Sequence, residues 1–260
     1  MKKVIIVAST HGHERIGLRV QQELIRLNLN PNLVEMVVGN PRASEKNIPF
    51  LEKDLNRIFP GHEHGTYEEV QAYKLSEKIK EADIVLDIHS TKTTDLGNNS
   101  MVIVTTLNNE TKEILKVIQP PKVLHMLYNA SGALIFQAKV GIAFEYGLDD
   151  INDVLQATIH DIAEILLYLG IIEKNPYSNP RVLQSTELFE VYDVCPKSFI
   201  EGYTLNDTLK NFTLVEKDMT VCKTDEGTEI NASEDFYPIL FGNNRYTEIL
   251  GFKARKIESL

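Results

Sequence analysis

The sequence predicts an α/β protein, in which a mainly parallel or mixed sheet is flanked by helices and followed by a small C-terminal β-rich domain. Three observations predict this class. Several short runs are almost wholly apolar and rich in β-branched residues, as are strands buried on both faces of a sheet. Segments with apolar residues at helical spacing alternate with these runs. Beyond residue 182, short strand-like runs separated by turn residues replace this alternation.

The expected elements follow one another in order along the chain. Residues 3–9 form an apolar run that predicts the first strand, and residues 16–28 carry apolar side chains at helical spacing. A second strand is expected over 33–38, where a Gly-Asn-Pro sequence stops it. Residues 42–65 show no clear period and predict a long loop. The later elements expected are helices over 67–82 and 153–170 and strands over 83–91, 101–106 and 140–147.

A short linker is expected between two domains. Residues 173–182 contain four residues that disfavour a continued helix or strand, namely Asn175, Pro176, Asn179 and Pro180. We therefore place an α/β domain over 1–172 and a β-rich domain over 183–260. The strand-like runs expected in the second domain are LFEVYDV, FTLV, FYPILF and ILGFKARKI.

Composition and charge argue against several classes of protein. The formal net charge is -10, and no basic face or polybasic patch suggests a nucleic acid or a membrane surface as partner. No apolar stretch approaches the ~20 residues of a membrane span, and the apolar run 4–8 is too short for a signal peptide. We therefore expect a cytoplasmic protein, with a homo-oligomer left open. Cys195 and Cys222 are interpreted as buried thiols, with one disulfide as the alternative.

Ionisable residues stand where three of the expected strands end. His11 and Glu14 lie three residues apart after the first strand, while His89 and Glu145 end two later strands. Functional groups of an open α/β sheet lie just beyond the carboxyl ends of its strands, so these side chains can meet. Two histidines and one carboxylate are a known catalytic zinc set that leaves a place for water. A further carboxylate is then needed to move the proton of that water to the leaving group.

Each of these motifs is also compatible with a simpler interpretation when it is taken alone. An H-x-x-E sequence is often only a polar loop, and His13 competes with His11 as a ligand. Asp87, two residues before His89, either orients that imidazole or is a solvated or capping residue. The remaining histidines are interpreted as solvated, packing or surface residues: His62, His64, His125 and His160.

Taken together, the motifs resemble the aspartoacylase and succinylglutamate desuccinylase family, a branch of the zinc carboxypeptidase-like hydrolases. The segments that carry the resemblance stand in order along most of the chain: STHGHERIG, GNPRA, DLNRIF, DIHST, FEYG and FYPILFGNNRY. The resemblance implies a zinc carboxypeptidase-like fold and hydrolysis of the amide bond of a small N-acyl amino acid or similar carboxylate. It also implies one Zn²⁺ per chain on His11, Glu14 and His89. Glu145 would be the general base and acid.

The resemblance further implies residues that bind the substrate. Asn56 and Arg57 of DLNRIF would hold its α-carboxylate, because a guanidinium meets a carboxylate with two parallel hydrogen bonds. Without the motif, Arg57 would be interpreted as part of a surface salt bridge. Tyr246 would contact the substrate from the second domain, and its alternative is a core position.

Two departures from the family pattern bear on the substrate. Pro49 stands where the family usually has an Arg that polarises the scissile carbonyl, and Arg42 or Lys53 could reach the same space. A missing cation of this kind could cost ~3 kcal/mol of transition-state stabilisation, by analogy with the loss of an oxyanion donor. Family members that recognise an aspartyl side chain carry an Arg shortly before the catalytic glutamate. Here only Lys139 precedes Glu145, so N-acetylaspartate is not assigned as the substrate.

Two other functions remain compatible with the same residues. A carboxypeptidase-like enzyme acting on small peptides would use the same site and differ in the width of its cleft. A metal- or ligand-binding protein that has lost catalysis is favoured by Pro49. It is opposed by Glu145, because a pure binding site has no need of a fourth acid.

Overall fold

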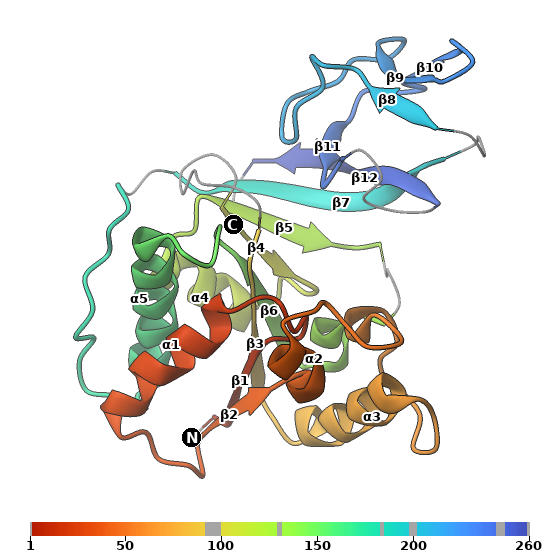
Figure 1. The fold of residues 1–260 in the computed structure, drawn as a ribbon. Helices are drawn as coiled ribbons and strands as arrows, with labels where there is room; N and C mark the ends of the chain where they lie inside the picture. The colour runs from red at the N-terminus through yellow and green to blue at the C-terminus, as the bar shows by residue number, and fades with distance from the viewer. Residues whose placement is uncertain are drawn as a thin grey trace. The chain divides into compact units, whose positions relative to one another are not determined.

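The computed structural model describes residues 2–91, 100–128, 132–182, 185–197, 202–242 and 248–258 (Figure 1). These residues fall into two compact units. The first holds the described residues of Met1–Leu124 and Asn129–Glu187, and the second those of His125–Tyr128 and Leu188–Ser259. The domain boundaries at residues 172 and 183 stay a proposal, which limited proteolysis would test.

A mainly parallel sheet forms the centre of the first unit. Its strands, among the described residues, are β1 (Val4–Ala8), β2 (Val34–Val38), β3 (Ile84–His89), β4 (Met101–Val104), β6 (Val140–Glu145) and β5 (Lys122–Met126), of which only the part up to Leu124 belongs to this unit. They stand in the order β5-β4-β6-β3-β1-β2. The pairs β1–β2, β1–β3 and β3–β6 are parallel, whereas β4 runs antiparallel to β6. Every residue of β1, β3 and β4 is buried, as in strands covered on both faces.

Helices cover both faces of this sheet. They are α1 (Ile16–Leu24), α2 (Pro41–Lys46), α3 (Tyr67–Lys80), α4 (Asn109–Ile118) and α5 (Asn152–Tyr168), with short 3₁₀ helices η1 (Ile25–Leu27), η2 (Leu55–Arg57) and η3 (Leu134–Gln137). Figure 1 shows α1, α4 and α5 gathered on one side and α3 on the other. Contacts of α5 with α1 and α4, and of α3 with η2 and η3, agree with this arrangement. The predicted α/β class is thereby confirmed.

Two parts of this unit differ from the elements expected. The segment 42–65, expected to be a loop, contains all of α2 except its first residue and the whole of η2. The six-residue α2 is too short to show a period, and it begins because Asn40 caps it by accepting a hydrogen bond from the Ala43 N–H at 3.3 Å. The helix α4 and the strand β5 were not predicted either. The signal in the sequence for α4 was its N-cap residue Asn108, whose side-chain oxygen accepts a hydrogen bond from the Thr111 N–H at 2.9 Å.

The second unit is built from antiparallel strands. Those described are β7 (Glu187–Pro196), β8 (Tyr203–Leu205), β9 (Thr220–Thr224), β10 (Glu229–Asn231), β11 (Tyr237–Ile239) and β12 (Ile249–Ile257). β12 pairs with β11 and β7, and β9 pairs with β8 and β10. The expected strand FTLV is not one, because only Val215 makes a bridge, to Phe236. Cys195 and Cys222 are both free thiols, and Cys222 lies buried in the core of this unit.

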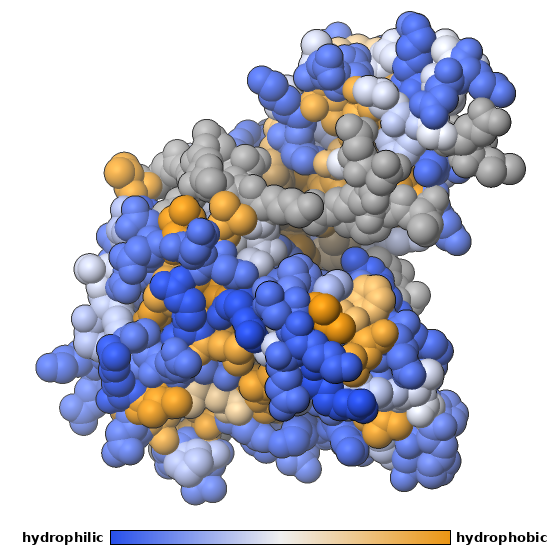
Figure 2. All heavy atoms as spheres, in the orientation of Figure 1, coloured by the Kyte–Doolittle hydropathy of each residue, from blue (hydrophilic) through white to orange (hydrophobic). Residues whose placement is uncertain are grey.

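Among the described residues, no helix combines the length and the apolar character needed to cross a membrane. On the face drawn in Figure 2, hydrophilic residues predominate over the first unit, and apolar residues are scattered among them.

Candidate active site

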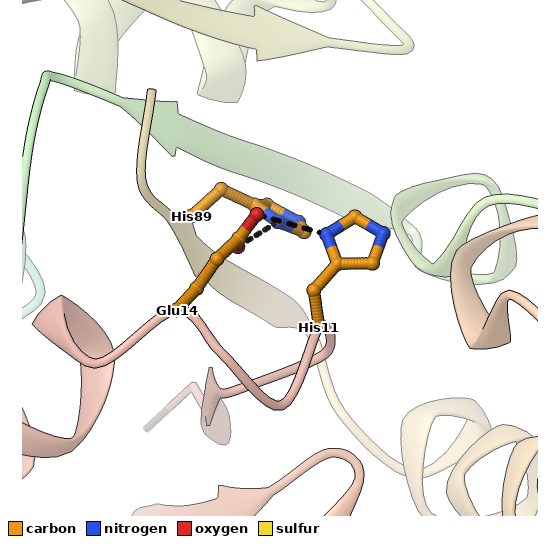
Figure 3. A group of neighbouring side chains, drawn as sticks. All are labelled: His11, Glu14 and His89. Carbon is orange, nitrogen blue, oxygen red and sulfur yellow. Dashed lines mark hydrogen bonds and ion pairs between the residues drawn. The ribbon is translucent and has the colours of Figure 1, made fainter. Parts of the chain in front are cut away.

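Three side chains from the ends of two neighbouring strands converge in the first unit. His11 and Glu14 lie in the loop after β1, and His89 is the last residue of β3 (Figure 3). The Glu14 carboxylate lies between the two imidazoles, with Oε1 3.0 Å from His11 Nδ1 and Oε2 2.8 Å from His89 Nδ1. One ligand atom from each residue lies within 4.8 Å of the others. The His89 side chain is 3% exposed and that of His11 18%, so the cluster opens toward solvent on the His11 side.

The local sequence explains how the loop after β1 brings two ligands together. Ser9 adopts a positive φ of 53°, which turns the chain sharply at the strand end, and its hydroxyl donates to the Glu14 carbonyl at 2.9 Å. Gly12 is required because a Cβ there would lie 2.2 Å from the carbonyl carbon of Ala43. The loop therefore packs directly against α2, and His11 and Glu14 are held on the same side of it.

The far nitrogen of each imidazole meets a carboxylate. His89 Nε2 lies 2.8 Å from Asp87 Oδ2, and His11 Nε2 lies 3.1 Å from Asp54 Oδ1. Asp87 is 1% exposed and also accepts a hydrogen bond from the Thr10 hydroxyl at 2.7 Å. Such partners fix the orientation of a ring and leave its other nitrogen available to a metal. Asp87 was predicted from the sequence and Asp54 was not, although Asp54 is the first residue of the DLNRIF segment.

Electrostatics in the cluster favour a negative Glu14 and positive imidazoles when no ion is bound. Burial alone would lower the pKa of His11, but hydrogen bonds with Asp54 and Glu14 raise it to about 9. Burial likewise acts against a charged His89, yet the charges of Asp87 and Glu14 raise the pKa of His89 well above its usual value. Burial acts to raise the pKa of Glu14, and the nearby imidazoles hold it far below its ordinary range instead.

These residues fit a divalent metal ion. Two imidazole nitrogens and a carboxylate oxygen about 2 Å from one ion would lie about 3.3 Å apart in a tetrahedron. In the structure, Oε1 of Glu14 lies 3.0 Å from His11 Nδ1 and Oε2 lies 2.8 Å from His89 Nδ1, and one ligand atom from each of the three residues lies within 4.8 Å of the others. The ion would replace the protons that now hold the three groups together. His13 is not part of this cluster, since it is exposed and its ring centroid lies 6.2 Å from that of His11.

Glu145 stands beside the cluster on the neighbouring strand. In the parallel pair β3–β6, His89 and Glu145 are partners in register, so they leave adjacent strands at the same edge of the sheet. Glu145 is half-buried. The backbone just after it is fixed on two sides. Ser100 donates its hydroxyl to the Tyr146 carbonyl at 2.6 Å, and the Thr91 N–H donates to the Gly147 carbonyl at 2.8 Å.

A buried polar network fixes the residue that follows Glu145. The Tyr146 hydroxyl donates to Asp161 of α5, and Arg181 Nη2 lies 2.6 Å from the other oxygen of that carboxylate. The side chains of Asp161 and Arg181 are 0% and 4% exposed. Sequence reasoning missed this network and placed Arg181 in a linker. The signal in the sequence for this network was Asp161, an aspartate on the apolar face of the strongly amphipathic helix α5.

The residues expected to hold a substrate carboxylate lie on η2. The Asn56 side-chain oxygen accepts a hydrogen bond from the Leu134 N–H at 2.8 Å, which leaves its amide N–H groups to face elsewhere. Arg57 is exposed and donates through Nη1 to the Asn56 carbonyl at 2.8 Å. Within the described part of the chain, no carboxylate lies at ion-pair distance from the Arg57 guanidinium. The surface salt bridge considered for Arg57 is therefore not seen there.

Other residues from the sequence analysis lie outside this cluster. Arg42 is exposed on α2, where its guanidinium stacks over the Tyr67 ring at 4.5 Å. Lys53 pairs with Glu69 at 2.6 Å. Both cations thus have other partners, and neither contacts the ligand set. Tyr246 lies outside the described residues.

Pro49 lies next to the loop after β1 that carries His11 and Glu14. Its carbonyl accepts a hydrogen bond from the Gly12 N–H at 3.1 Å. An arginine at this point of the chain would start beside the cluster. The absence of a cation at position 49 is therefore a departure within the site itself.

Comparison with solved structures shows that this fold is shared with murine aminoacylase 3. The structure of murine aminoacylase 3 superposes with a TM-score of 0.74 at 17% identity, over 98% of this chain and 95% of that chain. The family model for the succinylglutamate desuccinylase/aspartoacylase catalytic domain matches residues 1–147. The chain belongs to this family, which confirms the resemblance inferred from the motifs.

Sequence relatives agree with this assignment. A probable aspartoacylase of Acaryochloris marina is 37% identical over an alignment of 110 residues, and the match covers 37% of this chain and 37% of that protein. A probable aspartoacylase of Nostoc sp. is 27% identical over 214 residues, covering 74% of this chain and 70% of that one. The chain thus matches little more than a third of the length of the first of these relatives.

Proposed function

We propose that this protein is a zinc-dependent amidohydrolase that cleaves the amide bond of a small N-acyl amino acid. The observation that carries the proposal is the convergence of His11, Glu14 and His89 beside Glu145. Membership of the succinylglutamate desuccinylase/aspartoacylase family supports it, because the relatives bear the names of deacylases. Two imidazoles and one carboxylate are a ligand set typical of catalytic zinc.

Each residue of the site has a distinct task under this proposal. His11, Glu14 and His89 would hold one zinc ion, which when bound supplies a Lewis acid and lowers the pKa of water. Asp54 and Asp87 keep the two imidazoles turned toward the ion. Glu145 takes a proton from the attacking water and delivers it to the nitrogen of the leaving amine, which departs as a neutral group.

The substrate carboxylate would be held by η2. Arg57 lacks a carboxylate partner within the described residues, and Asn56 is fixed through its side-chain oxygen by Leu134. A substrate anion placed here would bring its amide bond toward the metal ligands, since η2 is tied to His11 through Asp54. Tyr246 remains a proposed additional substrate contact.

The same site also allows a function without catalysis, and Pro49 is the observation that favours it. Pro49 stands where an Arg would polarise the scissile carbonyl, and it contacts the loop that carries His11 and Glu14. Binding without turnover would then leave zinc in place and give no product. The decisive difference between the two functions is therefore the release of an amine.

An amine-release assay tests the proposal. Purified protein is analysed for zinc and incubated with a panel of N-acetyl and N-succinyl amino acids, and the free amine is detected with fluorescamine. About one zinc per chain and amine release that stops with a chelator are expected. Zinc without amine release from any substrate would favour the binding function, and absence of zinc would contradict the metal site.

A further inference from the structure

Glu68 carries a carboxylate with unusual partners, although it lies outside the ligand set. It is the second residue of α3 and is 0% exposed. Its two oxygens accept hydrogen bonds from three successive backbone N–H groups, of Leu51 at 2.7 Å, Glu52 at 3.2 Å and Lys53 at 3.4 Å. The side-chain amide of Asn40 donates a fourth, at 3.3 Å.

A buried carboxylate needs such partners. Removing an ionised carboxylate from water is costly unless hydrogen bonds or charges replace the water. In the part of the chain that the structure describes, no cation lies at ion-pair distance from Glu68, so backbone N–H groups supply the compensation. Consecutive N–H groups that point to one place form an anion-binding concavity. Here a side chain of the protein itself fills it, and the conformation of residues 51–53 depends on that anion.

The segment held by Glu68 leads directly into the site. Asp54 follows it, accepts a hydrogen bond from the Asn56 N–H at 2.9 Å and lies 3.1 Å from His11 Nε2. Arg57 comes next on η2. One carboxylate on α3 thus determines where the loop enters the turn that presents Asn56 and Arg57.

We propose that Glu68 is a positioning residue that anchors residues 51–53 and thereby places Asn56 and Arg57 for the carboxylate of the substrate. The inference rests on the proposed function for the role of the last two residues. Glu68 touches neither substrate nor metal in this scheme. Its effect is on substrate binding, because the groups that it positions bind the part of the substrate that does not react.

The variant E68Q separates charge from size. A glutamine fills the same space but turns one acceptor oxygen into an N–H donor that faces other donors. Hydrogen bonds to charged groups contribute enough that we expect KM to rise on the order of tenfold. The turnover number should change by less than about twofold and the zinc content not at all, because Glu145 and the ligands keep their places.

Glu69 offers a matched control on the same helix. Its carboxylate caps α3 through Thr66 and pairs with the Lys53 side chain, whereas the backbone N–H groups of residues 51–53 donate to Glu68. E69Q removes the same charge one residue away and should leave KM within about twofold. A rise in KM of equal size in both variants would mean a general effect at the start of the helix and would overturn the proposal.

Coupling to Arg57 tests the route of the effect. In an R57A background E68Q has only Asn56 left to position, so its effect on KM should fall well below tenfold. A tenfold effect that persists in that background, or an unchanged KM in E68Q alone, overturns the proposal. A merely structural role would lower stability without this dependence on Arg57.

Hydrogen exchange supplies a readout that does not need activity. Loss of the acceptor in E68Q should speed exchange of the amides of residues 51–57 on the order of tenfold, with other peptides unchanged. Unchanged exchange there, or faster exchange along the whole chain, overturns the anchor. If the wild type cleaves no substrate, the proposed function fails, and exchange in E68Q still decides whether Glu68 holds this loop.

Discussion

The two histidines of the candidate site have matching hydrogen-bond partners on their two ring nitrogens. Each imidazole turns Nδ1 toward Glu14 and Nε2 toward an aspartate, so both rings are held in the same sense. A neutral ring that donates through Nε2 keeps a lone pair on Nδ1, which is the form a metal ion requires. The site is therefore preorganised for an ion at the level of individual hydrogen bonds.

Replacement of His89 by alanine should abolish zinc binding. The change removes a ligand that is 3% exposed and leaves Glu14 with one partner fewer. Elemental analysis of purified H89A is expected to find far less than one zinc per chain. H13A is the control and should keep its zinc, because His13 lies outside the cluster. Full occupancy in H89A would rule out the assigned role.

Replacement of Glu145 by glutamine should separate binding from catalysis. The amide cannot take a proton from water, so turnover is expected to fall by about 10²–10⁴-fold. The zinc content should match that of the wild type. A variant that loses zinc would instead identify Glu145 as a ligand.

Metal binding should release protons at neutral pH. The pKa of His11 in the metal-free protein is about 9, so its ring is protonated at pH 7 and must lose that proton to bind an ion. Apparent zinc affinity should therefore rise with pH up to about 9 and rise less steeply above it. Calorimetry in buffers of different ionisation enthalpy measures the protons released. Release that is the same at pH 7 and pH 10 would contradict this assignment.

At the scale of elements, the sequence predicted strands and strand-end residues better than it predicted the connections. The apolar runs of β1, β3 and β6 are buried along almost their whole length, so their composition alone identifies them as strands. The helix α2 and the η2 turn depend instead on single caps, Asn40 and Asp54. Side-chain partners distant in the chain, such as Asp161 with Arg181, leave no periodic signal, and for that reason the linker hypothesis overlooked them.

The network behind Glu145 should contribute to stability through Arg181. Replacement of Arg181 by alanine leaves the Asp161 carboxylate buried with only its remaining hydrogen bonds. This change is expected to lower the free energy of unfolding by about 3–5 kcal/mol. Y146F removes one hydroxyl and should cost only about 0.5–1.5 kcal/mol. Urea denaturation measures both, and equal small losses would show that the ion pair carries little.

At the scale of the whole molecule, all four residues of the proposed chemistry belong to the first unit. The parallel strands of that unit bring together segments that are distant in sequence, and an ion bound there ties these segments to one another. The fold class was predictable because strand and helix alternation extends over most of the chain. The content of the cluster was predictable because its residues follow strands, where packing gives no reason for an ionisable residue, and because their motifs resemble those of a known family.

Removal of the metal should destabilise the whole protein. Binding to the folded state alone stabilises it by about 2.7 kcal/mol at a free metal concentration of 100 times Kd. The melting temperature should therefore rise when zinc is added to chelator-treated wild type. H89A should show no such rise, and a rise of the same size in it would mean that zinc acts elsewhere.

The parallel pairing of β3 with β6 has a consequence for how this chain can change in length. His89 and Glu145 meet across two strands of six residues each. A single residue inserted within either strand would reverse the facing of its end and send one partner to the opposite side of the sheet. Growth in the surface connections leaves the pair untouched. Insertions are therefore expected in the surface connections rather than within these two strands or in the loop that holds His11 and Glu14.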